Sequence, residues 1–426
     1  MDNRFSNIFN LTEDRAIALL KTPLNTEDGT SERYVGAAHL VNFPTERSIN
    51  ALIEAVEDRD PALENRIARR KAVESLGRLK AVKALPVLRS CLADEDVLTV
   101  ENAVWSIGEI GTEDESILEA IADLLNKPNQ TYRVIIHTLA NFDYKPAIDR
   151  IKPFTDYDDE SVQSAAIASL ARLTGDDSQM ERVVEFLQHD NINARRACIQ
   201  DLIDTEYYPA ISAMAKAPIS VAFRLRGIRL LAAKGIGANK ITFAEIESSL
   251  DRIIRDRPQD IDLIHEYDQP PSLEFLIKEL YHTDFGRCYL ADKTLLETHA
   301  DEVADALLKT YAEEAHNDYG AHFHVVKLLG LLRHQPSYDL IIEALHNTSP
   351  QFQKSRAAAA IALGNIGAAE AIPVLKETLN TPIFDLKYAC LLALEQLGEN
   401  CWSMAVDDKN LLIKAAAKHK SSQDDS

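Results

Sequence analysis

A motif that recurs every 31 to 34 residues constrains the fold of this chain more than any other feature of its sequence. Its copies share one apolar position, which is occupied by Leu76, Ile107, Leu139, Leu170, Leu202, Leu329, Leu363 and Leu397. Successive positions are 31 or 32 residues apart up to Leu202, and 34 apart at the end of the series. A period of this length is typical of arrays of helical hairpins, in which each unit buries its apolar face only against its neighbours.

Each copy of the motif contains two helical patterns. The first pattern, as in residues 84–92 and 371–379, has apolar residues three and four apart and a proline in its first turn, where proline loses no helical hydrogen bond. The second is rich in alanine and ends near a glycine, which adopts the left-handed conformation that closes many helices. The sequence therefore predicts an all-α, HEAT-like α/α solenoid of about ten helical hairpin repeats, curved so that the second helices line a concave groove.

The repeats extend over most of the chain. Residues 33–40 resemble a first copy, and the pattern weakens around 232–315 before it returns. We expect one continuous solenoid over residues 1–406, followed by a C-terminal helix end and polar tail over 407–426. The last part of this tail, residues 418–426, is polar and is expected to be disordered.

Charge and cysteine content exclude several classes of protein. With 46 Lys and Arg against 67 Asp and Glu, the net charge is −21, which argues against a nucleic-acid partner. No apolar run approaches the roughly 20 residues of a membrane helix, and the first residues lack a signal-peptide pattern. The five cysteines are widely separated and form no C-x-x-C pair, as expected of reduced thiols. We therefore expect a soluble, cytoplasmic protein with no metal site and no membrane partner.

Three segments give the sequence a family likeness. Residues 33–44, 101–111 and 284–291, in this order and spacing, resemble the E/F-type bilin lyases of cyanobacterial phycobilisomes, in particular the phycoerythrin-specific lyases and lyase-isomerases. The resemblance covers nearly the whole chain. It implies that the protein holds a linear tetrapyrrole, typically phycoerythrobilin, and presents it to a cysteine of a phycobiliprotein subunit, whose thiolate adds to the ethylidene carbon of ring A.

The resemblance also implies the partners. Phycoerythrobilin is a substrate, and no cofactor is expected to be permanently bound. The protein partner is an apo-phycoerythrin subunit, with the α-subunit as the first choice. Isomerising family members also shift a ring-A double bond and so convert phycoerythrobilin to phycourobilin. Some of them carry a His-Cys pair, which is absent from the cluster described next, so a plain lyase is the alternative.

The densest group of candidate catalytic side chains lies in residues 316–324. Asp318 and Tyr319 are expected at the start of a second helix, facing the groove, and His322 follows four and three residues later, on the same helical face. Such groups can supply the acid and base that thioether formation and isomerisation need. The alternatives are an N-cap role for Asp318 and ordinary packing for Tyr319. His322 and His324 point to different faces, so a metal site is not expected.

Basic residues near the starts of second helices are candidates to bind the two propionates of a bilin. The set comprises Arg133, Arg195, Arg196, Arg224, Arg226, Arg287 and Arg356. Arginine forms bidentate pairs with carboxylates, so we expect two of them to bind propionates, with Arg133, Arg195, Arg226 and Arg287 as candidates. The alternative is a structural ladder in which each arginine binds an aspartate and backbone carbonyl groups of the adjacent turn.

Two more residues are candidates for contact with the pigment. Trp105 could stack on a pyrrole ring or fill the core between repeats. Cys288 could form a transient thioether with the pigment, or be a buried, unreactive thiol. The function that the resemblance implies is attachment of phycoerythrobilin to a phycoerythrin subunit with isomerisation to phycourobilin. The alternatives are a plain lyase, a HEAT-repeat scaffold that binds protein, and a bilin chaperone.

Overall fold

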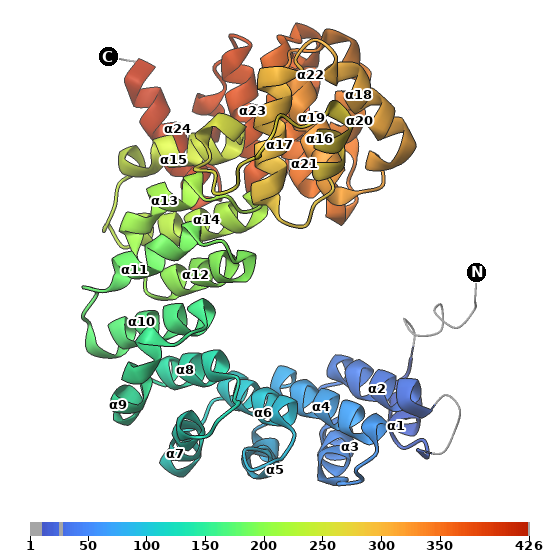
Figure 1. Cartoon of the computed structure of the whole chain (residues 1–426), viewed down its shortest axis with the longest axis vertical. Helices are drawn as coiled ribbons and strands as arrows, with labels where there is room; N and C mark the ends of the chain where they lie inside the picture. Colours follow the sequence, from blue (N-terminus) through green and yellow to red (C-terminus); the bar gives the residue numbers. More distant parts are fainter. Residues whose placement is uncertain (1–10, 25–28, 425–426) are drawn as a thin grey trace. The chain divides into compact units, whose positions relative to one another are not determined.

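A computed structural model describes residues 11–24 and 29–424 (Figure 1). Every regular element in these residues is helical, which confirms the all-α, HEAT-like prediction. The chain divides into two compact units, Met1–Gln179 and Met180–Ser426. One continuous solenoid over residues 1–406 stays a prediction. None of the helices in the described part of the chain is long and apolar enough to cross a membrane.

Unit 1 is a row of helical hairpins. Its helices are α1 (Glu13–Leu20), α2 (Gly29–His39), α3 (Glu46–Glu57), α4 (Leu63–Arg78), α5 (Leu85–Cys91), α6 (Val97–Ile110), α7 (Glu115–Asp123), α8 (Tyr132–Asn141), α9 (Ile148–Ile151) and α10 (Glu160–Thr174). The second helices α2, α4, α6, α8 and α10 pack side by side in sequence order. Prolines lie in first turns as predicted, for example in α5.

Small residues let these second helices approach closely. A Cβ atom on Gly77 of α4 would lie 2.7 Å from the Cα atom of Ser106 in α6, so only glycine fits there. The Ser106 hydroxyl donates a hydrogen bond of 2.9 Å to the Val73 carbonyl of α4, and Ser75 donates to Ala37 of α2 at 2.8 Å. The recurring pattern of small residues therefore marks the seams between repeats.

Unit 2 contains the remaining hairpins. Its helices are α11 (Met180–Glu185), α12 (Ile192–Asp204), α13 (Ile211–Lys216), α14 (Val221–Gly237), α15 (Phe243–Arg255), α16 (Leu273–Glu279), α17 (Phe285–Thr298), α18 (Val303–Thr310), α19 (Tyr319–Leu331), α20 (Tyr338–His346), α21 (Gln353–Ile366), α22 (Ile372–Thr378), α23 (Phe384–Gln396) and α24 (Leu411–Asp424). The second helices α17, α19, α21 and α23 again pack in order.

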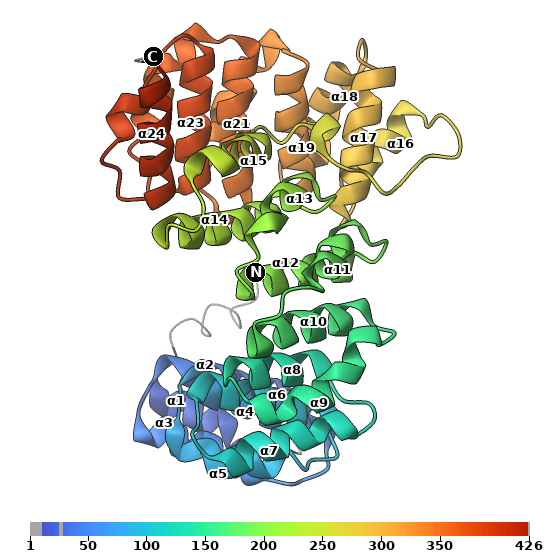
Figure 2. The same ribbon diagram turned by 90° about the vertical axis from the view of Figure 1, so that its left-hand side faces the viewer.

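The α14–α15 hairpin contacts the C-terminal helices of unit 2. Helix α15 packs against α21, α23 and α24, and α14 packs against α24, although the helices of each pair are far apart in the sequence. Figures 1 and 2 both show α15 beside the C-terminal helices. This contact places the α14–α15 hairpin opposite the first turns of α19, α21 and α23, and so forms the walls of a pocket.

The C-terminal segment differs from the prediction. The polar residues expected to be disordered from 418 onward belong to helix α24 as far as Asp424. Lys420 forms an ion pair with Glu247 of α15 at 2.9 Å, and Nε2 of His419 lies 3.2 Å from the same carboxylate. Ala416 and Ala417 on the same helix are fully buried. Contacts with α15, which lies far away in the sequence, stabilise this helix. The composition of the C-terminal segment alone does not reveal them.

Candidate functional site

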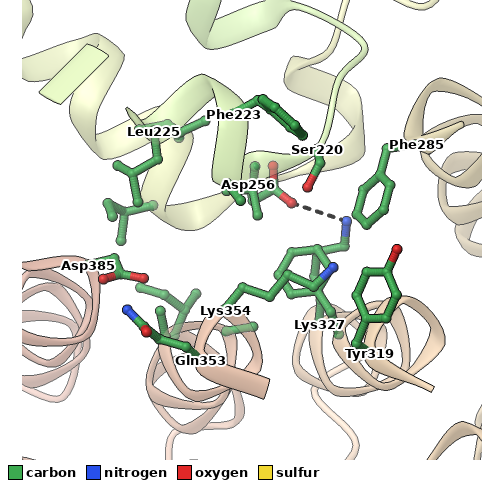
Figure 3. A pocket seen from close by; sticks show the side chains of 18 of the residues that line it. Ser220, Phe223, Leu225, Asp256, Phe285, Tyr319, Lys327, Gln353, Lys354 and Asp385 are labelled. Atoms are coloured by element: carbon green, nitrogen blue, oxygen red, sulfur yellow. Dashed lines mark hydrogen bonds and ion pairs between the residues drawn. The ribbon is translucent and has the colours of Figure 1, made fainter. Parts of the chain in front are cut away.

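Unit 2 contains a pocket of about 450 Å³ between the α14–α15 hairpin and the second helices α17 to α23 (Figure 3). Ligand pockets of proteins typically measure about 300 to 1,000 Å³. The first turns of three consecutive second helices contribute Tyr319 of α19, Lys354 of α21 and Asp385 of α23 to its wall. The arrangement of the repeats therefore brings a phenol, an amine and a carboxyl group to one cavity.

Aromatic rings form one side of the pocket. They are Phe223 of α14, Phe285 of α17, and Tyr319 and Phe323 of α19. Phe285 and Phe323 are buried and have their ring centres 6.5 Å apart, whereas Phe223 is 41% and Tyr319 54% exposed. Exposed aromatic rings beside a cavity provide flat apolar surface on which a conjugated ligand can stack.

The charges that line the pocket are mainly positive. Four cationic side chains face two carboxylates, which leaves an excess of two positive charges. The six residues are Arg196, Arg255, Lys327, Lys354, Asp256 and Asp385. Because the whole chain carries a net charge of −21, this local excess of positive charge is opposite in sign to the rest of the protein. Such a pocket favours an anionic ligand.

A buried network of charges forms the floor of the pocket. Arg224 donates a hydrogen bond to Asp256, and Lys327 lies 3.3 Å from Asp256 and 2.7 Å from Asp292. The Tyr289 hydroxyl also donates to Asp256, at 2.9 Å. Burial alone would raise the pKa of Asp256, but the adjacent Lys327 and Arg224 outweigh it and hold that pKa below its usual range. The network joins α14, α15, α17 and α19 and fixes the position of Lys327.

Lys354 differs from Lys327 because no carboxylate in the described part of the chain forms an ion pair with it. Its ammonium nitrogen lies 4.3 Å from the ring centre of Phe285, 4.9 Å from that of Tyr319 and 5.1 Å from that of Phe323. Burial lowers the pKa of Lys354 from 10.5 to about 8. The side chain is therefore a partly buried cation held by three aromatic rings on the pocket wall.

Asp385 is the second group of the wall with a shifted pKa. It is 9% exposed, and burial raises its pKa, against the opposing effects of Arg229 and a hydrogen bond from Gln353. A carboxyl group in such surroundings keeps its proton to higher pH than an exposed aspartate. It can donate or accept a proton nearer to neutral pH.

Of the three predicted catalytic residues, the structure places one in the pocket. Tyr319 lines it, whereas the Asp318 carboxylate accepts hydrogen bonds of 2.8 Å from the backbone of Gly320 and Ala321 and caps α19. His322 is 1% exposed, packs on Phe352 and does not line the pocket. Burial lowers the pKa of His322 to about 4, so its imidazole is neutral at pH 7. The catalytic roles of Asp318 and His322 remain predictions.

The four predicted propionate-binding arginines lie elsewhere. Arg195 is fully buried and pairs with Asp284 at 2.6 Å, which is the structural ladder considered as the alternative. Arg287 donates to both carboxylate oxygens of Glu279, at 2.7 and 2.8 Å. Arg226 is exposed on α14 outside the pocket, and Arg133 belongs to unit 1, where it donates to a backbone carbonyl. The arginines that line the pocket are Arg196 and Arg255.

The two remaining candidates are also outside the pocket. Cys288 of α17 is fully buried, its thiol donates to the His282 carbonyl at 3.3 Å, and burial raises its pKa, which suppresses the reactive thiolate. Trp105 is half-buried in α6 of unit 1. Neither position provides a contact with a ligand in this cavity.

Comparison with known proteins agrees with the repeat architecture. A family model of HEAT repeats matches residues 62–133 and 304–395. A protein of Pseudanabaena tenuis (strain PCC 7409), described as an uncharacterized phycocyanin operon protein Y, is 56% identical over 415 residues, which cover 97% of this chain and 99% of that protein. The bilin biosynthesis protein CpeY of Synechococcus sp. (strain WH8020) is 32% identical over 385 residues, which cover 88% of this chain and 91% of CpeY.

A solved structure is also similar to part of the chain. In the complex of CpcE and CpcF of phycocyanin lyase from Nostoc sp. PCC7120, the matching chain is 27% identical, with a TM-score of 0.47. The match covers 57% of this chain and 94% of that one. The identity to CpeY over most of both sequences, together with the HEAT repeats, shows that the chain belongs to the HEAT-repeat bilin lyase family.

Proposed function

We propose that the pocket of unit 2 holds a linear tetrapyrrole and that the protein attaches this pigment through a thioether to a cysteine of a phycobiliprotein subunit. Membership of the bilin lyase family supports the class of reaction. The observation that carries the assignment to this pocket is its combination of aromatic rings with an excess of two positive charges, within a strongly acidic chain.

The chemistry of the ligand fits this lining. A linear tetrapyrrole offers flat conjugated rings, which can stack on exposed aromatic side chains such as Tyr319 and Phe223. It also carries two propionates, which form charge-assisted hydrogen bonds with basic side chains. Holding the pigment in one conformation beside the incoming thiol would supply much of the rate acceleration, because the reaction then becomes effectively intramolecular.

The attachment step needs one proton transfer. The sulfur forms a bond to the ethylidene carbon of ring A, the carbon–carbon π bond breaks, and the proton lost by the thiol ends on the adjacent ring carbon. Asp385, whose pKa burial raises, and the phenol of Tyr319 are the pocket groups suited to donate or accept this proton. An isomerising lyase uses the same kind of group to move a proton from one ring carbon to another.

The specific substrates are part of the proposal. We take phycoerythrobilin as the pigment, the phycoerythrin α-subunit as the acceptor, and isomerisation to phycourobilin as the accompanying step. The resemblance to phycoerythrin-specific lyases supports this choice. The name of the relative from Pseudanabaena tenuis refers instead to a phycocyanin operon, so a phycocyanin subunit with phycocyanobilin is the competing acceptor.

Co-expression in a bacterial host tests the proposal. The protein is produced together with the enzymes that make phycoerythrobilin and with each phycoerythrin subunit in turn, and parallel cultures make phycocyanobilin and phycocyanin subunits. Acid-stable colour on the subunit, a modified cysteine peptide in the mass spectrum and the absorbance maximum identify the acceptor and the pigment isomer. We expect pigment on the phycoerythrin α-subunit, with the phycourobilin spectrum.

Other outcomes have distinct meanings. Phycoerythrobilin on the subunit without the phycourobilin spectrum would make the protein a plain lyase. Pigment that binds the protein but never becomes acid-stable on any subunit would indicate a bilin chaperone. If the protein neither binds pigment nor promotes attachment, the proposed function is wrong and a protein-binding scaffold becomes the better account.

A further inference from the structure

Lys354 occupies a defined place on the pocket wall. It is the second residue of α21, and its ammonium nitrogen lies within about 5 Å of three ring centres, those of Phe285, Tyr319 and Phe323. These rings come from two neighbouring helices, α17 and α19, and restrict the amine to one region of the cavity. Figure 3 shows the side chain directed toward Phe285 and Tyr319.

No carboxylate among the described residues forms an ion pair with Lys354. The neighbouring Lys327 provides the comparison, because it lies in the same pocket and touches two carboxylates, Asp292 at 2.7 Å and Asp256 at 3.3 Å. The Asp256 carboxylate is already shared between Lys327 and Arg224. One lysine of the pocket is therefore neutralised by the protein, and the other is not.

The titratable groups that face Lys354 do not neutralise its charge. Asp256 and Asp318 favour its charged form from a distance, while Lys327 opposes it. Cys288 stays protonated because burial raises its pKa, and Asp385 on α23 has a raised pKa as well. The net result is that burial dominates and lowers the pKa of Lys354 to about 8. At pH 7 it is still mainly an ammonium ion, partly stripped of water.

A partly desolvated cation without a partner is an unfavourable arrangement that an anionic ligand would relieve. Proteins keep such arrangements at binding sites, where the missing partner is supplied by the ligand. The surrounding rings offer apolar surface on the same side of the cavity. The rest of the ligand should therefore be apolar where it packs against them.

We propose that Lys354 binds a propionate carboxylate of the tetrapyrrole and so makes the pocket selective for pigments with free propionates. This inference rests on the proposed function and extends it by naming the residue and the ligand group that meet. Arg196 and Arg255 of the same pocket are left to bind the second propionate. The pocket would then bind esterified or otherwise neutral tetrapyrroles of the same size more weakly.

The test compares two forms of one pigment. Phycoerythrobilin and its dimethyl ester have the same conjugated system, but only the free acid carries carboxylates. Each is titrated by absorbance against the wild-type protein, Lys354→Met, Lys354→Arg and the control Lys376→Met, which removes a lysine on α22 that pairs with Glu399 outside the pocket. Circular dichroism establishes that each variant is folded.

We expect Lys354→Met to weaken binding of the free acid by about 10- to 100-fold, as for the loss of one charge-assisted hydrogen bond, and to leave binding of the ester unchanged. Lys354→Arg and Lys376→Met should stay within a few-fold of the wild type. The affinity of the wild type for the free acid should fall as the pH rises above about 8, where Lys354 loses its proton, and Lys354→Met should lack this pH dependence.

The two proposals fail in different ways. Lys354→Met could weaken binding of the free acid and of the ester equally, or leave both unchanged, while the wild type still attaches pigment in the co-expression assay. In either case the role proposed for Lys354 is wrong and the proposed function stands. If the wild type binds neither form of the pigment and no subunit is modified, the proposed function is wrong, and the inference falls with it.

Discussion

Replacement of Lys354 by methionine should stabilise the ligand-free protein while it impairs binding of the pigment. A pKa that falls from 10.5 to about 8 corresponds, at about 1.36 kcal/mol per pH unit, to about 3 kcal/mol of unfavourable free energy for the charged side chain in the folded state. The three ring contacts offset part of this unfavourable free energy, since cation–π interactions contribute about 0.5 to 1 kcal/mol each at exposed sites. Together the three contacts offset about 1.5 to 3 kcal/mol, so we expect a net gain of up to about 1.5 kcal/mol from Lys354→Met at pH 7.

The pH dependence of this gain has a defined sign. Below pH 8 the lysine is charged in both the folded and the unfolded protein, so the wild type bears the full penalty. As the pH rises from 8 to 10.5, the folded protein loses the proton before the unfolded chain does, and the stability of the wild type increases. The advantage of the methionine variant should therefore be largest below pH 8 and shrink over this interval.

Urea unfolding at pH 7 and pH 9.5 measures the effect. The chain has two tryptophans, one in each unit, so a Trp105→Phe background leaves Trp402 as the fluorescent reporter of unit 2. Lys376→Met serves as the control, because an exposed ion pair contributes at most about 1 kcal/mol. A loss of stability in Lys354→Met would show that the lysine stabilises the ligand-free fold and is not an unpaired cation reserved for a ligand.

Three further predictions follow from the contacts of the predicted site residues. Asp318→Ala should lower the free energy of unfolding by about 1 kcal/mol in urea, because the α19 cap is lost. Asp318→Asn should keep the cap; wild-type attachment of pigment by this variant would make Asp318 a cap alone, and slow attachment by a stable variant would support the predicted catalytic role. Cys288→Ala should attach pigment at the wild-type rate in the co-expression assay, because the thiol is buried and protonated. A folded but inactive variant would show that the thiol takes part in attachment. Arg195→Met should lower the free energy of unfolding by about 3 to 5 kcal/mol, because it leaves Asp284 without its buried partner, and a change below 1 kcal/mol would contradict that role.

The fold could be predicted because its determinants are local and repeated. Each hairpin needs the same small residues at the seam and the same glycine or proline at the helix ends, so they recur with a fixed period. Gly77 illustrates this, since its place in the motif reflects the close approach of Ser106. The contact of α15 with α21 and α24 could not be predicted in this way, because it joins segments far apart in the sequence.

The site was predictable only in part. The rule that first turns of second helices face the ligand led to Tyr319, and the same rule applied to α21 and α23 would have led to Lys354 and Asp385. The neighbours Arg195 and Arg196 show the limit of sequence reasoning. One is fully buried against Asp284 and the other lines the pocket, and only the rotation of α12 about its axis decides between them.

A bulky side chain in the pocket would show whether unit 2 holds the pigment during attachment. Ala222 and Ala238 are both exposed, Ala222 on α14 facing the pocket and Ala238 at the C-terminal end of the same helix outside it. Each is changed to tryptophan, and acid-stable pigment on the phycoerythrin subunit is measured after co-expression. We expect Ala222→Trp to abolish attachment and Ala238→Trp to retain it. Wild-type attachment by a folded Ala222→Trp variant would show that the pigment does not occupy this pocket.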